Sequence, residues 1–235
     1  MTKPSNNKYI NYNPFWDIKK SHILVFLFCF AIISVLTITS STKGLDNIVS
    51  DFFKTISRNE QSDLLMIIIT TFSDTINLIV IGFILTIIKK TRQFGMILLI
   101  CLVSITIIVT YVKPLFAVEQ PAQIFYPLIN LPDKFTLEKD SFMPFAQNYS
   151  YPSNHLASTT AFSFIIAGLI YNRRHPYFAK SFIIFFPLII GITKIYLLQQ
   201  HFSDLLGGYF LGLIISSLSI KLLKLEPTGQ KRTPK

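Results

Sequence analysis

Charged residues are scarce in this sequence. They make up 14% of its 235 residues and hydrophobic residues make up 51%, whereas a soluble globular domain carries roughly 25% charged residues. Cysteine is scarcer still, because Cys29 and Cys101 are the only two and both lie inside apolar runs, where they make no metal-binding pattern. Internal repeats and low-complexity tracts are also lacking. The shortage of charge argues against an ordinary soluble domain and directs attention to the apolar runs.

Long apolar runs are what the sequence has instead. Runs of roughly 18 or more apolar residues are long enough to cross a ~30 Å hydrocarbon core. No small-x-small cleavage site is evident after the first run, so we expect a retained helix there rather than a signal peptide. The expected fold class is all-α, a polytopic membrane protein with a bundle of six transmembrane helices. The expected spans are residues 23–39, 64–88, 95–112, 156–171, 178–198 and 205–223.

The distribution of basic residues predicts the orientation in the membrane. A net charge of +10 in a soluble protein would suggest nucleic acid, but here the basic residues sit in short segments between apolar runs. With six spans, 15 of the 22 Lys and Arg residues fall on one side, together with both termini. The excess of positive charge makes that side cytoplasmic. We therefore expect a protein of the plasma (inner) membrane with no nucleic-acid partner.

The same topology predicts the domain organisation. Residues 1–22 form a cytoplasmic N-terminal segment, residues 23–225 form one membrane domain, and residues 226–235 form a basic cytoplasmic tail. Polar residues near a membrane are costly unless they are paired or functional. Three polar clusters stand out, and all lie on the expected exoplasmic side. They are Lys113 with Gln120 and Pro121, then Pro152-Ser153-Asn154-His155, and finally Lys194 with Gln200, His201 and Asp204.

These residue types suit the transfer of a phosphoryl group. Two histidines, His155 and His201, can serve as general acid and nucleophile, and a carboxylate such as Asp204 can orient an imidazole. Lysines and the backbone N–H groups at a helix start make an anion site. Asp74 and Asn77, inside the second expected span, are either structural hydrogen-bonding residues or part of a head-group cavity.

In order and spacing, the clusters resemble the motifs of the type 2 phosphatidic acid phosphatase (PAP2) family, the membrane relatives of vanadium haloperoxidases. That family has Lys-x6-Arg-Pro, then Pro-Ser-Gly-His, then Ser-Arg-x5-His-x3-Asp, on one side of six helices. The resemblance covers about residues 64–223. The corresponding segments here are Lys113-x6-Gln120-Pro121, Pro152-Ser153-Asn154-His155 and Thr193-Lys194-x6-His201-x2-Asp204.

The resemblance implies a role for each matching residue. His201 would attack phosphorus, Asp204 would orient it, and His155 would protonate the leaving oxygen. No metal or other cofactor is implied, because histidine supplies the nucleophile and cationic side chains neutralise the phosphate. The residues that would hold the phosphate are Lys113, Gln120, Ser153, Asn154 and Lys194.

Departures from the family pattern leave one assignment open. Gln120 and Lys194 stand where the family has arginine, and a bidentate guanidinium is not replaced conservatively by either. The third motif has one residue too many before His201 and one too few after it. At strict spacing Gln200 would take the place of the nucleophile, which would mean a dead or altered enzyme. We favour a shift inside the turn, since loops tolerate such changes, and this keeps His201 as nucleophile.

The function expected from this pattern is a membrane lipid phosphatase with its active site at the exoplasmic face. The expected partners are membrane lipids and a lipid phosphate or diphosphate, of the polyprenyl diphosphate, phosphatidic acid, phosphatidylglycerol phosphate or lipid A type. A phosphotransferase between lipids would use the same residues. A catalytically weak or inactive lipid-binding protein is the main alternative, and Gln120, Lys194 and the irregular third motif favour it. A small transporter is a third alternative.

Overall fold

The computed structural model of the chain describes residues 19–122, 125–132, 136–171 and 176–223. The expected basic tail, and all but the last four residues of the expected N-terminal segment, lie outside the described residues. In the described ranges the regular elements are helices, and no strand longer than an isolated bridge between Glu119 and Tyr149 occurs. The helices are α1 (Lys20–Ile38), α2 (Lys43–Thr55), α3 (Glu60–Phe72), α4 (Thr75–Ile87), α5 (Arg92–Phe116), the short 3-10 helix η2 (Pro144–Ala146), α6 (Asn154–Tyr171), α7 (Pro176–Tyr196) and α8 (Phe202–Leu222).

The expected all-helical membrane fold is confirmed, whereas the count of six spans is not. Among the described helices, α1, α5, α7 and α8 are long and apolar enough to cross a membrane, and α3 with α4 adds a fifth span if this bent pair is counted as one. Helix α6 falls outside this set because its first half carries many polar side chains. These side chains, including Ser158, Thr159 and Thr160, are buried among the neighbouring helices.

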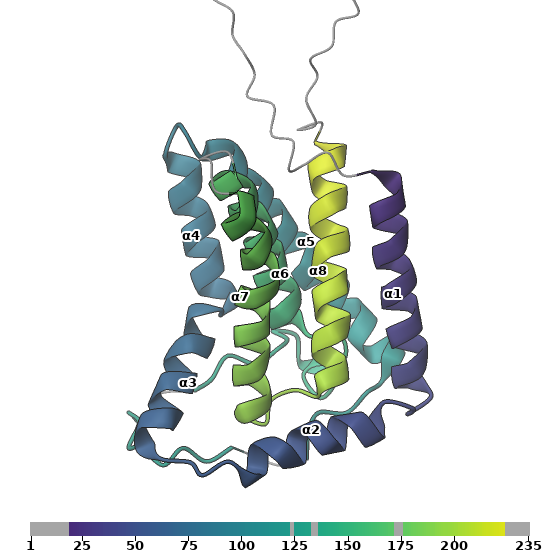
Figure 1. Cartoon of the computed structure of the whole chain (residues 1–235), viewed down its shortest axis with the longest axis vertical. Coiled ribbons are helices and arrows are strands. Elements are labelled where there is room, and N and C mark those ends of the chain that lie inside the picture. Colours follow the sequence, from purple (N-terminus) through teal and green to yellow (C-terminus); the bar gives the residue numbers. More distant parts are fainter. Residues whose placement is uncertain (1–18, 123–124, 133–135, 172–175, 224–235) are drawn as a thin grey trace, which may run out of the picture.

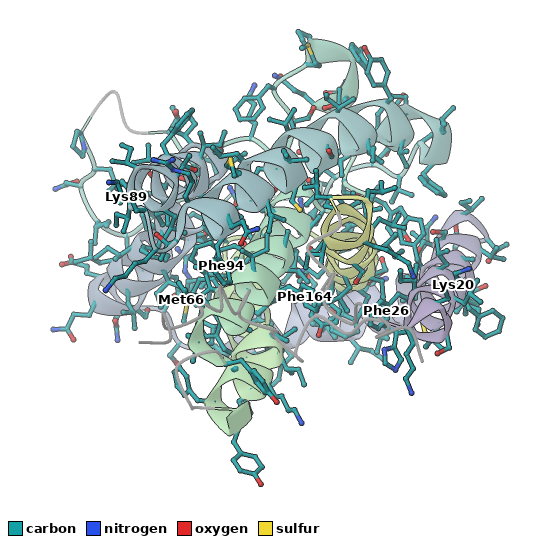
Figure 2. The ribbon with its side chains drawn as sticks, turned by 90° about the horizontal axis from the view of Figure 1, so that it is seen from above. Lys20, Phe26, Met66, Lys89, Phe94 and Phe164 are labelled. Carbon is teal, nitrogen blue, oxygen red and sulfur yellow. The ribbon has the colours of Figure 1, made fainter. Side chains whose placement is uncertain are left out.

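Helix α6 forms the centre of the bundle. It packs against α5, α7 and α8, and most of its residues are buried. Helix α1 is at the rim beside α8, as the view down the bundle shows (Figure 2). Its outward side chains, such as Leu24 and Phe28, are exposed in the isolated chain, as expected of a surface that faces lipid. The beginning of α1 and the end of α8, where the described chain starts and stops, lie at the same end of the bundle (Figure 1).

The second expected span is broken rather than continuous. Helices α3 and α4 meet at an angle of 49°, and the break falls at Ser73 and Asp74. A break leaves the first N–H groups of the following helix without intrahelical partners. The Thr75 N–H, in the first turn of α4, donates instead to Glu138 Oε2 at 2.7 Å. A carboxylate from a distant loop therefore stabilises the bend, and the bend brings Asp74 to the polar end of the bundle.

Helix α2 lies where a simple link between spans was expected. It is amphipathic and lies across the end of the bundle opposite the described chain ends (Figure 1). Val49 and Phe53 pack against the cluster between α6, α7 and α8, while Ile48 and Phe52 are exposed. Such a helix suits the plane of a membrane interface. Hydropathy along the chain did not reveal it, because its apolar residues are spread over a helical stripe rather than gathered in a run.

Glycines allow α8 to approach α6 closely. A Cβ atom on Gly208 would lie 2.5 Å from the Ser153 carbonyl oxygen, and one on Gly212 would lie 2.5 Å from the Ala157 carbonyl oxygen. Small residues at such contacts are typical of helix packing in membranes. The contact matters for the site, since Ser153 directly precedes α6.

The variant Gly208→Ala is expected to lower the free energy of unfolding by about 1–3 kcal/mol, because the added methyl group meets backbone that cannot move aside. Thermal unfolding in detergent, compared with the wild type, measures the effect. Gly44→Ala is the matched control, since no atom lies within 4 Å of the position of its Cβ. Equal melting temperatures for Gly208→Ala and the wild type would contradict the close approach of the two helices.

Candidate active site

The three polar clusters meet at the end of the bundle where α2 lies. Helix α5 ends there, while α6 and α8 begin there (Figure 1). The starts of α6 and α8 are joined directly, because the Ser153 N–H donates to the Asp204 carbonyl oxygen at 3.1 Å. The long loop between α5 and α6 covers this junction and adds side chains of its own.

Lys113, in the last turn of α5, is fully buried and forms an ion pair with Asp140 of the loop, with 2.7 Å between Nζ and Oδ2. Its Nζ also donates to the carbonyl oxygens of Tyr149 and Ser150. Burial alone would raise the pKa of Asp140, but the ammonium of Lys113 and the His155 ring hold this pKa well below its usual range. Asp140 is therefore ionised, and the charge of Lys113 is neutralised inside the protein rather than offered to a ligand.

His155, in the first turn of α6, is held by carboxylates at both ring nitrogens. Nδ1 lies 2.7 Å from Asp140 Oδ1, and Nε2 lies 3.1 Å from Glu138 Oε2 and 3.6 Å from Asp74 Oδ1. Because an ionised carboxylate only accepts hydrogen bonds, Nδ1 carries a proton. The backbone N–H of His155 also donates to Asp140. The ring is fixed in orientation, with Nε2 directed at two further carboxylates.

A cavity of about 370 Å³ lies beside His155. Its lining includes Gln120, Glu138, Lys139 and Gln200. Gln200 is 3% exposed, and both polar atoms of its side chain lack a hydrogen-bond partner among the residues that the structure describes. Gln200 thus occupies the cavity that contains His155, as the strict spacing of the third motif requires.

His201 lines a different cavity, of about 510 Å³, together with Lys43, Asp46 and Glu119. The structure therefore does not bring His201 and His155 together, and the shift that we favoured inside the turn is not observed. Burial lowers the pKa of His201, against the opposing effects of the Asp46 charge and a hydrogen bond with the Glu119 backbone. The assignment of His201 as nucleophile stays a prediction, without support from its position.

Asp204 does not orient the His201 ring. Its Oδ2 accepts a hydrogen bond from the backbone N–H of His201 at 2.8 Å, and its Oδ1 accepts one from Ser150 Oγ at 3.1 Å. Acceptance of a backbone N–H by an acidic residue in the first turn is the pattern of a helix cap. The position of Asp204 therefore indicates that it fixes the start of α8.

The expected phosphate-binding residues are dispersed among several roles. Lys194 is buried and donates to Gln199 Oε1 at 3.0 Å, while Gln120 is exposed and donates to the Gln147 carbonyl oxygen at 2.8 Å. The Oγ of Ser153 caps α6 by accepting from the Leu156 N–H. The Asn154 N–H donates to Asp140 and its side-chain amide contacts Thr75. Gln120 lines both cavities, and Ser153 and Asn154 hold the start of α6. Lys194 lies close enough to Asp74, Glu138 and Asp140 for their charges to interact, so it belongs to the surroundings of His155.

Sequence reasoning missed the carboxylates that surround His155. Glu138 and Asp140 lie in the long loop, 17 and 15 residues before His155, and belong to no motif. A possible signal was the charged triplet Glu138-Lys139-Asp140 in a segment otherwise poor in charge. Asp74 was recognised as unusual, but a continuous helix gave no reason to place it beside His155. A carboxylate oxygen of Asp74, a carboxylate oxygen of Glu138 and a ring nitrogen of His155 lie close enough together to hold a metal ion.

Comparisons with known proteins identify the family and the fold. A family model described as the PAP2 superfamily matches residues 94–226, more than half of the chain. The fold is similar to a crystal structure described as the first transmembrane PAP2 type phosphatidylglycerolphosphate phosphatase from Bacillus subtilis. The TM-score is 0.66 and the sequence identity 20%, and the match covers 89% of this chain and 98% of that chain. No curated protein sequence matches the chain significantly.

Proposed function

Since this chain belongs to the PAP2 superfamily, as the resemblance of its motifs indicated, we propose that it is an integral membrane phosphatase acting on a lipid phosphate or diphosphate beside His155. The observation that carries the proposal is the convergence of the family's three motif regions on one cavity. Gln120, His155 and Gln200, one from each region, all line it. Cavities with a few convergent polar groups are the usual place for catalysis.

An apolar cavity supports a lipid substrate. It has a volume of about 310 Å³ and lies between α2, α7 and α8, with Phe53, Pro187 and Leu205 in its lining. Leu156, the residue after His155, lines it too. We propose that this cavity takes part of an acyl or polyprenyl chain while the head group lies in the polar cavity. Phosphatidic acid, phosphatidylglycerol phosphate, polyprenyl diphosphate and a lipid A phosphate all have this form.

The proposed reaction uses water as the nucleophile. Glutamine has no atom that can form a phosphoenzyme, and His201 lines the other cavity. The water oxygen forms a bond to phosphorus as the bond from phosphorus to the lipid oxygen breaks. The proton that water loses ends on the departing oxygen, so the products are inorganic phosphate and a lipid alcohol, or inorganic phosphate and a lipid monophosphate when the substrate is a diphosphate. Lys139, an exposed residue in the cavity lining, and Lys194, whose charge acts on His155, are the cations that would meet the phosphate.

A second candidate function is the binding of a lipid phosphate without turnover. The observation that favours it is the presence of Gln200 in the cavity at the position that strict spacing gives to the family's histidine. The neutral Gln120, where the family has arginine, points the same way. Both candidates use the same cavity and differ only in whether phosphate is released.

Phosphate release by the purified protein in detergent tests the first candidate. The panel contains the four lipid classes named above, each measured in EDTA and with added Mn²⁺. We expect release from at least one lipid under one of these conditions. Absence of release from every lipid, with retained binding of a lipid phosphate by native mass spectrometry, would establish the second candidate. Absence of both release and binding would overturn both candidates.

A further inference from the structure

Three ligand-type side chains meet beside the polar cavity from separate parts of the chain. Asp74 comes from the break between α3 and α4, Glu138 from the long loop, and His155 from the first turn of α6. One carboxylate oxygen of each acid and a ring nitrogen of the histidine all lie within 4.8 Å of one another. Side chains of Asp74 and Glu138 are 17% and 10% exposed, so the group is largely shielded from solvent.

Several polar atoms around this group are buried and unused. Glu138 Oε1 has no hydrogen-bond partner in the described part of the chain, and Asp74 Oδ1 faces the His155 ring, with Nε2 3.6 Å away. Gln200 supplies an independent observation, because it is 97% buried, lines the same cavity and leaves both its amide oxygen and its amide nitrogen unpaired there. Buried polar groups are normally hydrogen-bonded or bound to an ion, since leaving them unpaired costs free energy. The unpaired Glu138 Oε1 and the unpaired amide of Gln200, both at this cavity, therefore point to a ligand.

The hydrogen bonds of His155 fit a metal ligand. Its Nδ1–H donates to Asp140, which is fixed in turn by Lys113 and by the Asn154 N–H. Histidines that bind metals usually donate their second ring N–H to a carboxylate in this way. When Nε2 is unprotonated, its lone pair faces Glu138 and Asp74. In a neutral ring that arrangement is repulsive unless a cation lies between Nε2 and the carboxylates.

We propose that Asp74, Glu138 and His155 bind a divalent transition-metal cation, with the amide oxygen of Gln200 as a further ligand or as a partner of a metal-bound water. One imidazole with two carboxylates is a ligand set that suits Zn²⁺ or Mn²⁺ better than Ca²⁺ or Mg²⁺, which prefer oxygen alone. The set leaves positions open, as catalytic sites do. This departs from the metal independence expected from the sequence.

Such a cation would add to the positive charge of Lys194 near a cavity whose lining includes the carboxylates of Glu138 and Asp140. It would supply the positive charge that Gln120 lacks. It would also lower the pKa of the attacking water. His201 cannot activate this water, because it lines the other cavity. This use of the metal rests on the proposed phosphatase function, whereas the binding of the metal does not. Binding is therefore measured directly, without any lipid.

The test is titration of the purified chain with Zn²⁺ by isothermal calorimetry and with Mn²⁺ by electron paramagnetic resonance. We expect one tight site in the wild type and at least about 10-fold weaker binding in Glu138→Gln and in Asp74→Asn. Glu138→Gln should still fold, because its amide oxygen can accept the Thr75 N–H that caps α4. Glu119→Gln is the matched control, since this carboxylate lines the other cavity and should leave affinity unchanged.

Thermal unfolding provides the second readout. Saturating Zn²⁺ or Mn²⁺ should raise the melting temperature of the wild type and of Glu119→Gln, but not of Glu138→Gln, because a ligand stabilises only a fold that binds it. Equal affinity in the wild type and Glu138→Gln, or no binding to the wild type, would overturn the site and indicate that a protonated His155 balances the carboxylates. Phosphate release in EDTA by a chain that binds no metal would overturn the site while supporting the phosphatase.

Discussion

Replacing His155 by alanine is expected to reduce phosphate release at least about 100-fold, the loss usual when a group that directs proton transfer or holds a catalytic ion is removed. His155 is 1% exposed, and its Nε2 is directed at Glu138 and Asp74 beside the cavity. Initial rates of phosphate release at saturating lipid, wild type against variant, measure the effect. Unchanged release would mean that the reaction takes place elsewhere.

The matched variant His201→Ala is expected to keep its rate within a few-fold of the wild type. His201 is half-buried in the second cavity, and its backbone N–H donates to the Asp204 carboxylate. The pair of variants therefore separates two assignments that the sequence could not separate. Loss of all activity in His201→Ala, together with a labelled phosphohistidine, would restore His201 as the nucleophile and remove the case for water.

Replacing Lys113 by methionine is expected to cost about 3–5 kcal/mol of stability, the usual result of removing one partner of a buried ion pair. Both side chains are buried, with 0% of Lys113 and 5% of Asp140 exposed. The variant leaves the Asp140 charge without its cation and also removes donors from two carbonyl oxygens. Thermal unfolding in detergent and the yield of monodisperse protein measure the loss.

Lys54→Met is the control for that loss. It breaks an ion pair with Asp51 whose side chains are 37% and 68% exposed, and such surface pairs contribute about 0–1 kcal/mol. The double variant Lys113→Met/Asp140→Asn should recover part of the stability, because it removes the uncompensated charge. Equal melting temperatures for Lys113→Met and Lys54→Met would contradict the role of the buried pair in holding the loop over the site.

The two large effects have a common structural origin. Asp140 accepts hydrogen bonds from His155 and from the start of α6 while it pairs with Lys113 of α5. One loop carboxylate therefore joins the last turn of α5 to the first turn of α6. Lys113 was expected to hold phosphate, but in the structure it orders the loop that surrounds His155. Its loss should consequently affect the fold before it affects any ligand.

The sequence by itself determined the membrane class, the helical fold and the family. Apolar runs are a local property, and a segment that must satisfy its backbone hydrogen bonds in lipid forms a helix wherever such a run occurs. The spacing of Lys113, His155 and Lys194 in three motifs was likewise readable along the chain and pointed to the family whose model matches residues 94–226. The strict spacing of the third motif agrees with the place of Gln200 in the lining of the His155 cavity, whereas the shift that we favoured stays a prediction.

Only the tertiary structure decided which side chains share the cavity. The break at Asp74 is stabilised by Glu138, which accepts a hydrogen bond from the backbone N–H of Thr75, 63 residues earlier in the chain. The partner of Lys113 is a loop residue outside every motif. Whether Gln200 or His201 lines the cavity of His155 depends on the conformation of a short turn, which hydropathy does not register. These features arise from ion pairs and hydrogen bonds between distant segments, so no pattern along the chain could specify them.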